Sequence, residues 1–429
     1  MFKNPLGTFY GWRVTAGAFV LAVFGWGIGF YGPPVWLGAV HAAHGWSIAL
    51  ISAAVTTHFL LGAAVGASVP QLYRRFGAAR VTMAGSLAMA SGILAWAIAV
   101  SPWQLFVAAA LTAIGWGSMS APALNALVSP WFFRARPAAL GMAYNGGSIG
   151  GVIFSPLWVA VIGLMGFALS TATIGLVMLV AVWIIAGLLF SRTPQQMGLR
   201  ADGDAPNIVP TRTRLQTAAL PGARLLRDRK FLTLAAGMAL GLFAQIGLVA
   251  HLFTLLSPAL GAQNAGLAMG LVTALAIVGR TAMGWLMPAN VDRRLIACAG
   301  YALQCLGSLV LLAAGGTSVP LIMTGIVLFG CGFGNATSLP PLIAQMEFAD
   351  EDTPRAVSLI VASAQAAYAF APAMFGVIRD FAPATGLAAD GGVGVFVGAA
   401  AFQALAIAAF YAGRGERRRG VAATRAAIG

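Results

Sequence analysis

Twelve long apolar stretches, separated by short polar breaks, fill most of this sequence. An α-helix needs about 20 apolar residues to cross the hydrocarbon core of a bilayer, and each stretch reaches that length. The first six lie at about 14–40, 47–70, 79–100, 103–129, 138–163 and 167–190. The second six lie at about 231–257, 264–287, 295–315, 319–345, 355–378 and 392–413. Runs of this kind predict an all-α membrane protein, since β-barrels use alternating segments of about 10 residues.

The scarcity of charge supports the same fold class. Only 8% of the 429 residues are charged and 59% are hydrophobic, whereas a soluble domain carries about 25% charged residues. So few charges cannot cover a surface that faces water. A soluble enzyme, a disordered chain and a coiled coil are therefore excluded.

The basic residues define a topology. If the N-terminus lies in the cytoplasm, 23 of the 25 Lys and Arg fall on the cytoplasmic side, and only Arg280 and Arg379 do not. This bias is the positive-inside rule of membrane proteins. Basic residues spread over short loops, rather than gathered on one face, also argue against nucleic-acid binding despite the net charge of +14. We expect a monomer in a bacterial-type inner (plasma) membrane, surrounded by lipid, with both termini cytoplasmic.

The two halves of the sequence repeat each other. A glycine, a proline and an arginine recur at an offset of 218 residues: Gly66, Pro70 and Arg75, then Gly284, Pro288 and Arg293. Such repeats are typical of transporters built from two bundles. The predicted division is a six-helix bundle (1–190), a basic cytoplasmic linker (191–230), a second six-helix bundle (231–414) and a cytoplasmic tail (415–429).

Three motifs extend this pattern to a known family. They are FYGWRVTAGAF at Phe9–Phe19, PQLYRRFGAARV at Pro70–Val81 and GRTAMGWLMP at Gly279–Pro288. With twelve spans, a repeat of six and a basic central loop, the chain resembles the major facilitator superfamily, and within it the bacterial monocarboxylate-porter branch. The resemblance implies two six-helix bundles that carry a small molecule. Two family positions depart from the pattern, because Tyr73 and Ala276 stand where an Asp is usual.

Arg280 is the one full charge that the sequence places well inside a span. An arginine at that depth costs about 2.5–3.5 kcal/mol on insertion scales, so it should face a cavity rather than lipid. Its planar fork of donors matches a carboxylate. We hypothesise that Arg280 binds the carboxylate of a small organic anion, and one cation favours a monoanion. The alternative is a structural arginine whose long side chain reaches toward the helix end.

Other polar residues inside spans are further candidates. The candidate substrate contacts are Ser118 in span four, Tyr144 and Asn145 in span five, Asn335 in span ten, and Gln365 and Tyr368 in span eleven. Asn145 is expected near Arg280, because spans five and eight face each other in the family fold. For each of these residues the alternative is a hydrogen bond between helices.

His58, in the middle of span two, is the candidate proton-coupling residue, since histidine titrates near neutral pH. A histidine held between helices is the other interpretation. Three residues are candidates for gating: Tyr31, Arg75 and Arg293. Tyr31 and Trp36 are expected near the outer face, as interface anchors or as an outer gate. Arg75 and Arg293 are expected at the cytoplasmic ends of spans, where helix C-termini favour cations.

The sequence predicts a secondary carrier that works by alternating access. The expected substrate is a small monocarboxylate such as lactate or pyruvate, with a proton as the candidate symported ion. One alternative is an exporter of drugs or other organic anions, and a second is a non-transporting membrane sensor with the same fold. An enzyme is not expected, because no catalytic carboxylates or clustered histidines lie within the spans. No cofactor and no metal site are predicted.

Overall fold

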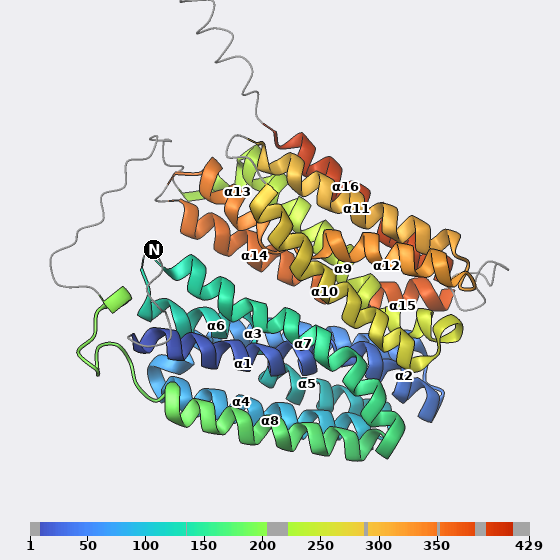
Figure 1. Ribbon diagram of the computed structural model, residues 1–429, viewed down its shortest axis with the longest axis horizontal. Helices are drawn as coiled ribbons and strands as arrows, with labels where there is room; N and C mark the ends of the chain where they lie inside the picture. The colour runs from blue at the N-terminus through green and yellow to red at the C-terminus, as the bar shows by residue number, and fades with distance from the viewer. Residues whose placement is uncertain are drawn as a thin grey trace, which may run out of the picture.

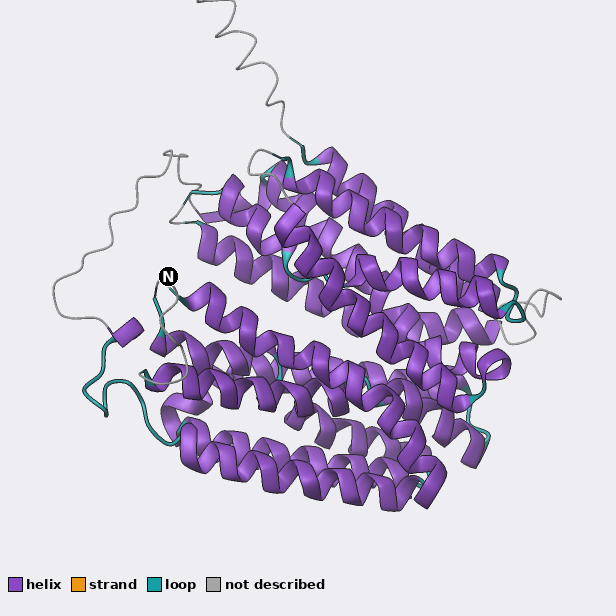
Figure 2. Cartoon of the chain, viewed as in Figure 1, coloured by secondary structure: helices purple, strands orange, loops and turns teal. Residues whose placement is uncertain are grey.

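A computed structural model describes residues 9–133, 135–203, 222–286, 291–349, 352–381 and 392–414. Helices form nearly all of this part of the chain (Figure 2). Eleven of its helical segments are long and apolar enough to cross a membrane, and the shorter apolar helix Val319–Phe333 belongs to a twelfth span. The predicted all-α fold with twelve spans is confirmed. Parts of the predicted linker (204–221), the predicted tail (415–429) and the repeat residue Pro288 lie outside the described residues.

The first half supplies six spans in chain order. They are α1 (Tyr10–Gly29) with α2 (Pro33–His44), α3 (Ile48–Phe76), α4 (Ala78–Ile98), α5 (Pro102–Met119) with α6 (Ala121–Val128), α7 (Arg136–Met165) and α8 (Phe167–Leu189). The first and fourth spans are each broken into two helices.

The second half supplies the other six. They are α9 (Arg229–Leu260), α10 (Ala262–Leu286), α11 (Arg293–Ala313), α12 (Val319–Phe333) with α13 (Leu339–Glu347), α14 (Thr353–Ala369) with α15 (Ala371–Phe381), and α16 (Gly392–Ala412). The tenth and eleventh spans are each broken into two helices. Because the tenth span is the counterpart of the fourth, these two spans break at corresponding places in the two halves.

Two bundles lie side by side, α1–α8 in blue to green and α9–α16 in yellow-green to red (Figure 1). They meet where α7 packs on α10 and where α3 packs on α15 and α14. We call the end of the bundles where the described chain begins and finishes, at Phe9 and Arg414, the terminal side. The opposite end, where α2 and the loop between α9 and α10 lie, is the far side (Figure 1).

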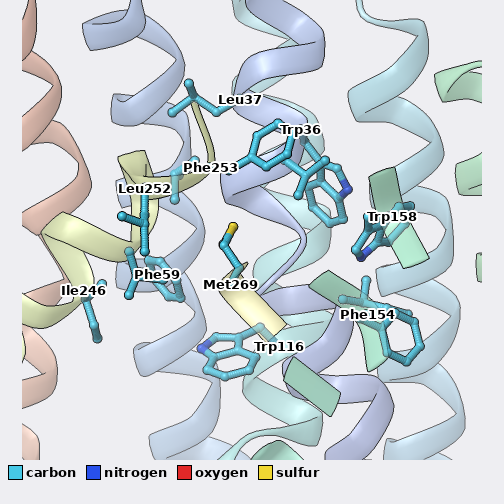
Figure 3. Packing of buried hydrophobic residues seen from close by; sticks show 14 of the residues in the cluster. Trp36, Leu37, Phe59, Trp116, Phe154, Trp158, Ile246, Leu252, Phe253 and Met269 are labelled. Atoms are coloured by element: carbon cyan, nitrogen blue, oxygen red, sulfur yellow. The ribbon is translucent and has the colours of Figure 1, made fainter. Parts of the chain in front are cut away.

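One apolar core crosses from bundle to bundle toward the far side. It joins Trp36 and Phe59 of the first half to Ile246, Phe253 and Met269 of the second (Figure 3). A separate apolar cluster, built from the second half alone, lies toward the terminal side of that bundle. The shared core therefore holds the two bundles together mainly on the far side.

Candidate functional site

Arg280 lies on α10 and caps the end of a neighbouring helix. Its Nε donates a hydrogen bond of 2.8 Å to the carbonyl of Gly334, which directly follows the last residue of α12. The last carbonyls of a helix have no partner within the helix, and a cation is favoured there. The approach needs glycine, because a Cβ on Gly334 would lie 2.0 Å from the carbonyl oxygen of Ala276. Arg280 therefore makes a structural hydrogen bond, which agrees with the alternative interpretation of this residue as a structural arginine.

A second nitrogen of the same guanidinium faces the first half. Nη1 lies 3.5 Å from the side-chain oxygen of Asn145 on α7, across the seam between the bundles. Arg280 is half-buried and Asn145 is exposed. The structure thus places Asn145 beside Arg280. A carboxylate that arrives at this point would meet the η nitrogens, because Nε is already bonded to Gly334.

Tyr31 also lies at this seam rather than at a membrane surface. Its side chain is buried and packs on Gly151 of α7, where an added Cβ would meet its ring at 2.6 Å. The same Cβ would lie 2.7 Å from Thr273 of α10, so helices of both halves surround the ring. The phenol is close enough to Arg280 for an electrostatic interaction. Tyr31 therefore belongs to the surroundings of Arg280. Trp36 is fully buried against Trp96 and Trp158, which argues against an interface anchor and leaves the outer gate as the prediction for this residue.

The break in span one explains the contacts of His58. Pro33 has no N–H, so the carbonyl of Gly29 loses the donor that a continuous helix would supply four residues later. His58 Nε2 lies 3.0 Å from that carbonyl oxygen and donates to it, and Nδ1 lies 2.9 Å from Thr112 Oγ1. The side chain is buried between α1, α3 and α5, inside the first bundle. This geometry gives His58 a local role at the break, and its role in proton coupling stays a prediction.

Aromatic rings line the seam next to Tyr31. The ring of Phe30 lies 4.9 Å from that of Tyr31 and 6.0 Å from that of Phe59. The ring of Phe59 lies 6.1 Å from that of Tyr368 on α14, which belongs to the second half. An apolar cavity between the halves continues from these rings, and its lining residues are Phe30, Pro33, Pro34, Val55, Phe59, Ile246, Val249 and Ala250.

Three other residues were predicted to contact the substrate. Ser118 lies apart from Arg280, Tyr144 contacts a helix break, and Asn335 lies in one. Ser118 bonds to the carbonyl of Ile114 at 2.8 Å and packs on Gly85 of α4, inside the first bundle. The hydroxyl of Tyr144 donates to the carbonyl of Ala121 at 3.4 Å. Asn335 is buried in the break between α12 and α13, one residue after the carbonyl that Arg280 caps.

The remaining predicted residues lie on α14 or near the terminal side. Gln365 and Tyr368 lie three residues apart on α14 and are both half-buried, with the ring of Tyr368 beside that of Phe59 in the first half. Arg293 donates to the carbonyl of Leu342 on α13 at 3.3 Å, and Arg75 lies over the ring of Phe76 at 5.1 Å. Their gating roles stay predictions.

The sequence interpretation missed the residues that hold the end of α12. The side-chain amide of Gln304 donates to the carbonyl of Gly332 at 3.1 Å, and that of Gln245 to the carbonyl of Phe333 at 3.5 Å. With Arg280, these residues supply donors to three successive carbonyls. The sequence contains a signal for these contacts. Gln245 and Gln304 place side-chain amides inside otherwise apolar spans, and span ten contains a glycine-rich segment.

Two solved transporter structures share the fold. The nucleoside transporter NupG, solved as a mutant, superposes with a TM-score of 0.73 at 12% identity, over 94% of this chain and all of that one. A bacterial homologue of the human lysosomal transporter Spinster, inward-facing and unoccupied, gives 0.72 at 15% identity, over 94% of this chain and 97% of that one. At these identities the likeness concerns the fold alone.

Curated relatives come from fungi. The MFS transporter asaE of Aspergillus flavus is 28% identical over 291 residues, which is 66% of this chain and 60% of that protein. The fujikurins efflux protein of Gibberella fujikuroi is 32% identical over 117 residues, 27% of this chain and 24% of that protein. The chain thus matches less than two thirds of the length of these relatives.

A family profile covers far more of the sequence. The profile of the Major Facilitator Superfamily matches residues 15–372, which is most of the chain. The described residues form the two helical bundles that the solved transporters share. On this evidence the chain belongs to the major facilitator superfamily.

Proposed function

We propose that this protein is a secondary carrier that moves an organic anion across the membrane by alternating access, with Arg280 as the residue that binds the anion. The observation that supports this most strongly is the position of the guanidinium. Its Nε is fixed to α12, while Nη1 points across the seam to Asn145 of the other bundle. A site held by both bundles changes when they rock against each other, as alternating access requires.

The contacts between the bundles suggest which side is open. Toward the far side, the backbone N–H of Ala49 donates to Asp380 at 2.9 Å, and that of Ala373 donates to Thr56 at 3.1 Å. The shared apolar core lies there too. Asn145, on α7, remains exposed. These features support a pathway that is closed on the far side and reaches Arg280 from the terminal side.

The charge distribution supports an orientation. The basic residues gather in the loops and termini of the terminal side, and positive-inside topology would make that side cytoplasmic. We therefore infer an inward-open arrangement of a plasma-membrane carrier with both termini inside. His58 remains the candidate for proton coupling in this proposal.

Two substrate directions follow from different observations. The motifs shared with the monocarboxylate-porter branch favour a small monocarboxylate such as lactate or pyruvate. The name of one relative, the fujikurins efflux protein, describes efflux, which favours the alternative of an exporter of organic anions. Arg280 is compatible with both, because both place one negative charge at the guanidinium.

Counterflow in proteoliposomes tests the proposal. Proteoliposomes that contain the purified protein are loaded with unlabelled carboxylate. Uptake of the labelled acid is then followed for the wild type, Arg280→Lys and Arg74→Ala. Arg280→Lys keeps the charge but loses the fork of donors, which should lower uptake about tenfold or more, since a hydrogen bond to a charged group contributes about 1.5–3 kcal/mol. Arg74 is an exposed arginine on α3, so its variant should transport normally. Normal transport by Arg280→Lys would refute the role of Arg280.

A further inference from the structure

We propose that the anion carries an apolar body the size of an aromatic ring, which binds against a wall of aromatic side chains beside Arg280. This inference rests on the proposed function and names its substrate class. The aromatic wall consists of Trp26, Phe30, Phe59, Trp116 and Tyr368.

The rings of the wall are connected. The ring centroids of Trp26 and Trp116 are 5.1 Å apart, and those of Phe30 and Trp116 are 6.3 Å apart. Phe30 leads to Phe59 at 6.0 Å, and Phe59 to Tyr368 at 6.1 Å. Four rings come from the first half and one from the second, so the wall spans the seam as Arg280 and Asn145 do.

Three of these rings remain partly accessible. Trp26, Phe30 and Tyr368 are half-buried, whereas Trp116 and Phe59 behind them are nearly covered. Trp26 and Phe30 lie four residues apart, so they share one face of α1. Aromatic surface that stays accessible within a membrane protein, at the seam between two moving bundles, is available to an apolar ligand.

The wall begins next to the charge. Phe30 directly precedes Tyr31, and their rings are 4.9 Å apart. The ring of Tyr31 packs on Gly151 of α7 beside Thr273 of α10, and α7 and α10 are the helices that carry Asn145 and Arg280. A ligand that places its carboxylate on the η nitrogens would therefore reach past Tyr31 with its body toward Phe30 and Phe59. Lactate and pyruvate have no apolar body that reaches these rings.

A small apolar cavity lies beyond the wall, between the two halves. Phe30, Val55 and Phe59 line it from the first half, and Ile246 and Val249 line it from the second. Figure 3 shows Phe59 and Ile246 next to each other at this seam. A ring bound against the accessible faces of Trp26, Phe30 and Tyr368 contacts both bundles at once and removes apolar surface from water, which favours binding in proportion to the area buried.

Calorimetric binding titrations with a matched set of compounds test this inference. The probes are 3-phenylpropionate, propionate and the uncharged 3-phenylpropanol, added to the full-length protein in detergent. The phenyl acid should bind about tenfold or more tightly than propionate, because of these two acids only the phenyl acid has a ring to bury. The alcohol should bind more weakly than the phenyl acid, because it lacks the charge.

Variants locate the effect on the wall. Phe59→Leu and Trp26→Leu keep an apolar side chain but remove a ring, and each should weaken binding of 3-phenylpropionate about tenfold while propionate is unaffected. The matched control is Phe243→Leu, because the ring of Phe243 packs on Phe375 and Phe402 inside the second half.

The outcomes separate the two proposals. Equal affinity for propionate and 3-phenylpropionate, or unchanged binding of the phenyl acid by both wall variants, would overturn the substrate class. If Arg280→Lys still lost binding of both acids in those cases, the proposed carrier of organic anions would stand. Wild-type affinity of Arg280→Lys for both acids would overturn the proposed function itself.

Discussion

At the scale of single residues, the proposed function gives the guanidinium of Arg280 two tasks. Nε caps the carbonyl of Gly334, and Nη1 extends toward Asn145. A capping bond needs only a donor, whereas recognition of an anion also needs the charge. The two tasks can therefore be separated by a side chain that donates without carrying charge.

Arg280→Gln makes that separation. Glutamine retains an N–H donor for the end of α12 but removes the positive charge. The variant should keep a melting temperature within a few degrees of the wild type, with anion affinity reduced about 30-fold or more. Thermal unfolding and binding titration on the same sample measure both. A variant that unfolds early yet binds anions normally would reverse this division of tasks.

His58 offers a second test at this scale. His58→Ala leaves the carbonyl of Gly29 buried without a donor, which costs about 1–3 kcal/mol. The variant should unfold more easily than His58→Gln, which keeps a donor. His41→Ala is the control, because His41 is exposed on α2 and bonds only at the surface, to the carbonyl of Trp46. Equal unfolding free energies for His58→Ala and the wild type would show that the bond at the break stabilises nothing.

The sequence predicts which residues lie near each other only where the helices pack in the arrangement of the family fold. Asn145 could be placed near Arg280 because the family fold sets span five against span eight. Ser118 could not be placed, because its position depends on the rotation of α5, which turns it toward Gly85 of α4. The place of Tyr31 was also hidden. Its side chain follows the break between α1 and α2 into the seam, and a continuous helix would direct it elsewhere.

At the scale of elements, the candidate site combines helix breaks with residues inside intact helices. Spans four and ten break at corresponding places, at Ser120 and at 334–338. Broken helices in matching positions of two repeats are typical of transporter binding sites. The spans themselves could be predicted from hydropathy, because each needs only length and apolar composition. The breaks at 334–338 and Phe370 could not, because glycine and proline also occur within intact spans of this chain, such as Pro70 in α3 and Pro156 in α7.

A buried ion pair joins four helices of the second half. Arg294 of α11, 1% exposed, meets Glu347 of α13 through two bonds of 2.7 and 2.8 Å. The same guanidinium donates to the carbonyl of Lys230 on α9 at 2.8 Å and to that of Phe410 on α16 at 3.5 Å. The two charges are 53 residues apart in the sequence, so their spacing alone does not pair them.

Glu347→Gln tests how much this ion pair contributes to the free energy of unfolding. Removing one partner leaves a charge buried and uncompensated, so the variant should lose about 3 kcal/mol of unfolding free energy. The control is Asp292→Asn, which removes the partner of Arg414 in a half-exposed pair of 2.7 Å, and such pairs contribute little. Urea or thermal unfolding in detergent compares the two. Similar losses in both variants would contradict the structural importance of Arg294.

At the scale of the whole molecule, the two bundles are held together on the far side. Asp380 of α15 accepts a hydrogen bond from Ala49 in the first turn of α3, where a helix N-terminus favours a negative charge. The contact crosses the seam, so it stabilises the arrangement that is closed on the far side. Breaking it should shift the population toward the opposite arrangement.

Asp380→Asn should produce that shift. Loss of a charge at a helix N-terminus costs about 0.3–1 kcal/mol, which changes the ratio of the two arrangements about two- to fivefold. A cysteine at Ala138, an exposed position on α7 near the terminal side, reports the change through slower labelling by a polar thiol reagent. Unchanged labelling, with expression and folding intact, would mean that this contact does not govern the equilibrium.

A structure with 4-bromobenzoate bound tests the central claim most directly. The account predicts density for the carboxylate within hydrogen-bonding distance of the η nitrogens of Arg280, and the bromine beside Phe30 and Phe59. A ligand bound away from the guanidinium, with Arg280 still joined to Asn145, would contradict the claim that this arginine is the anion site.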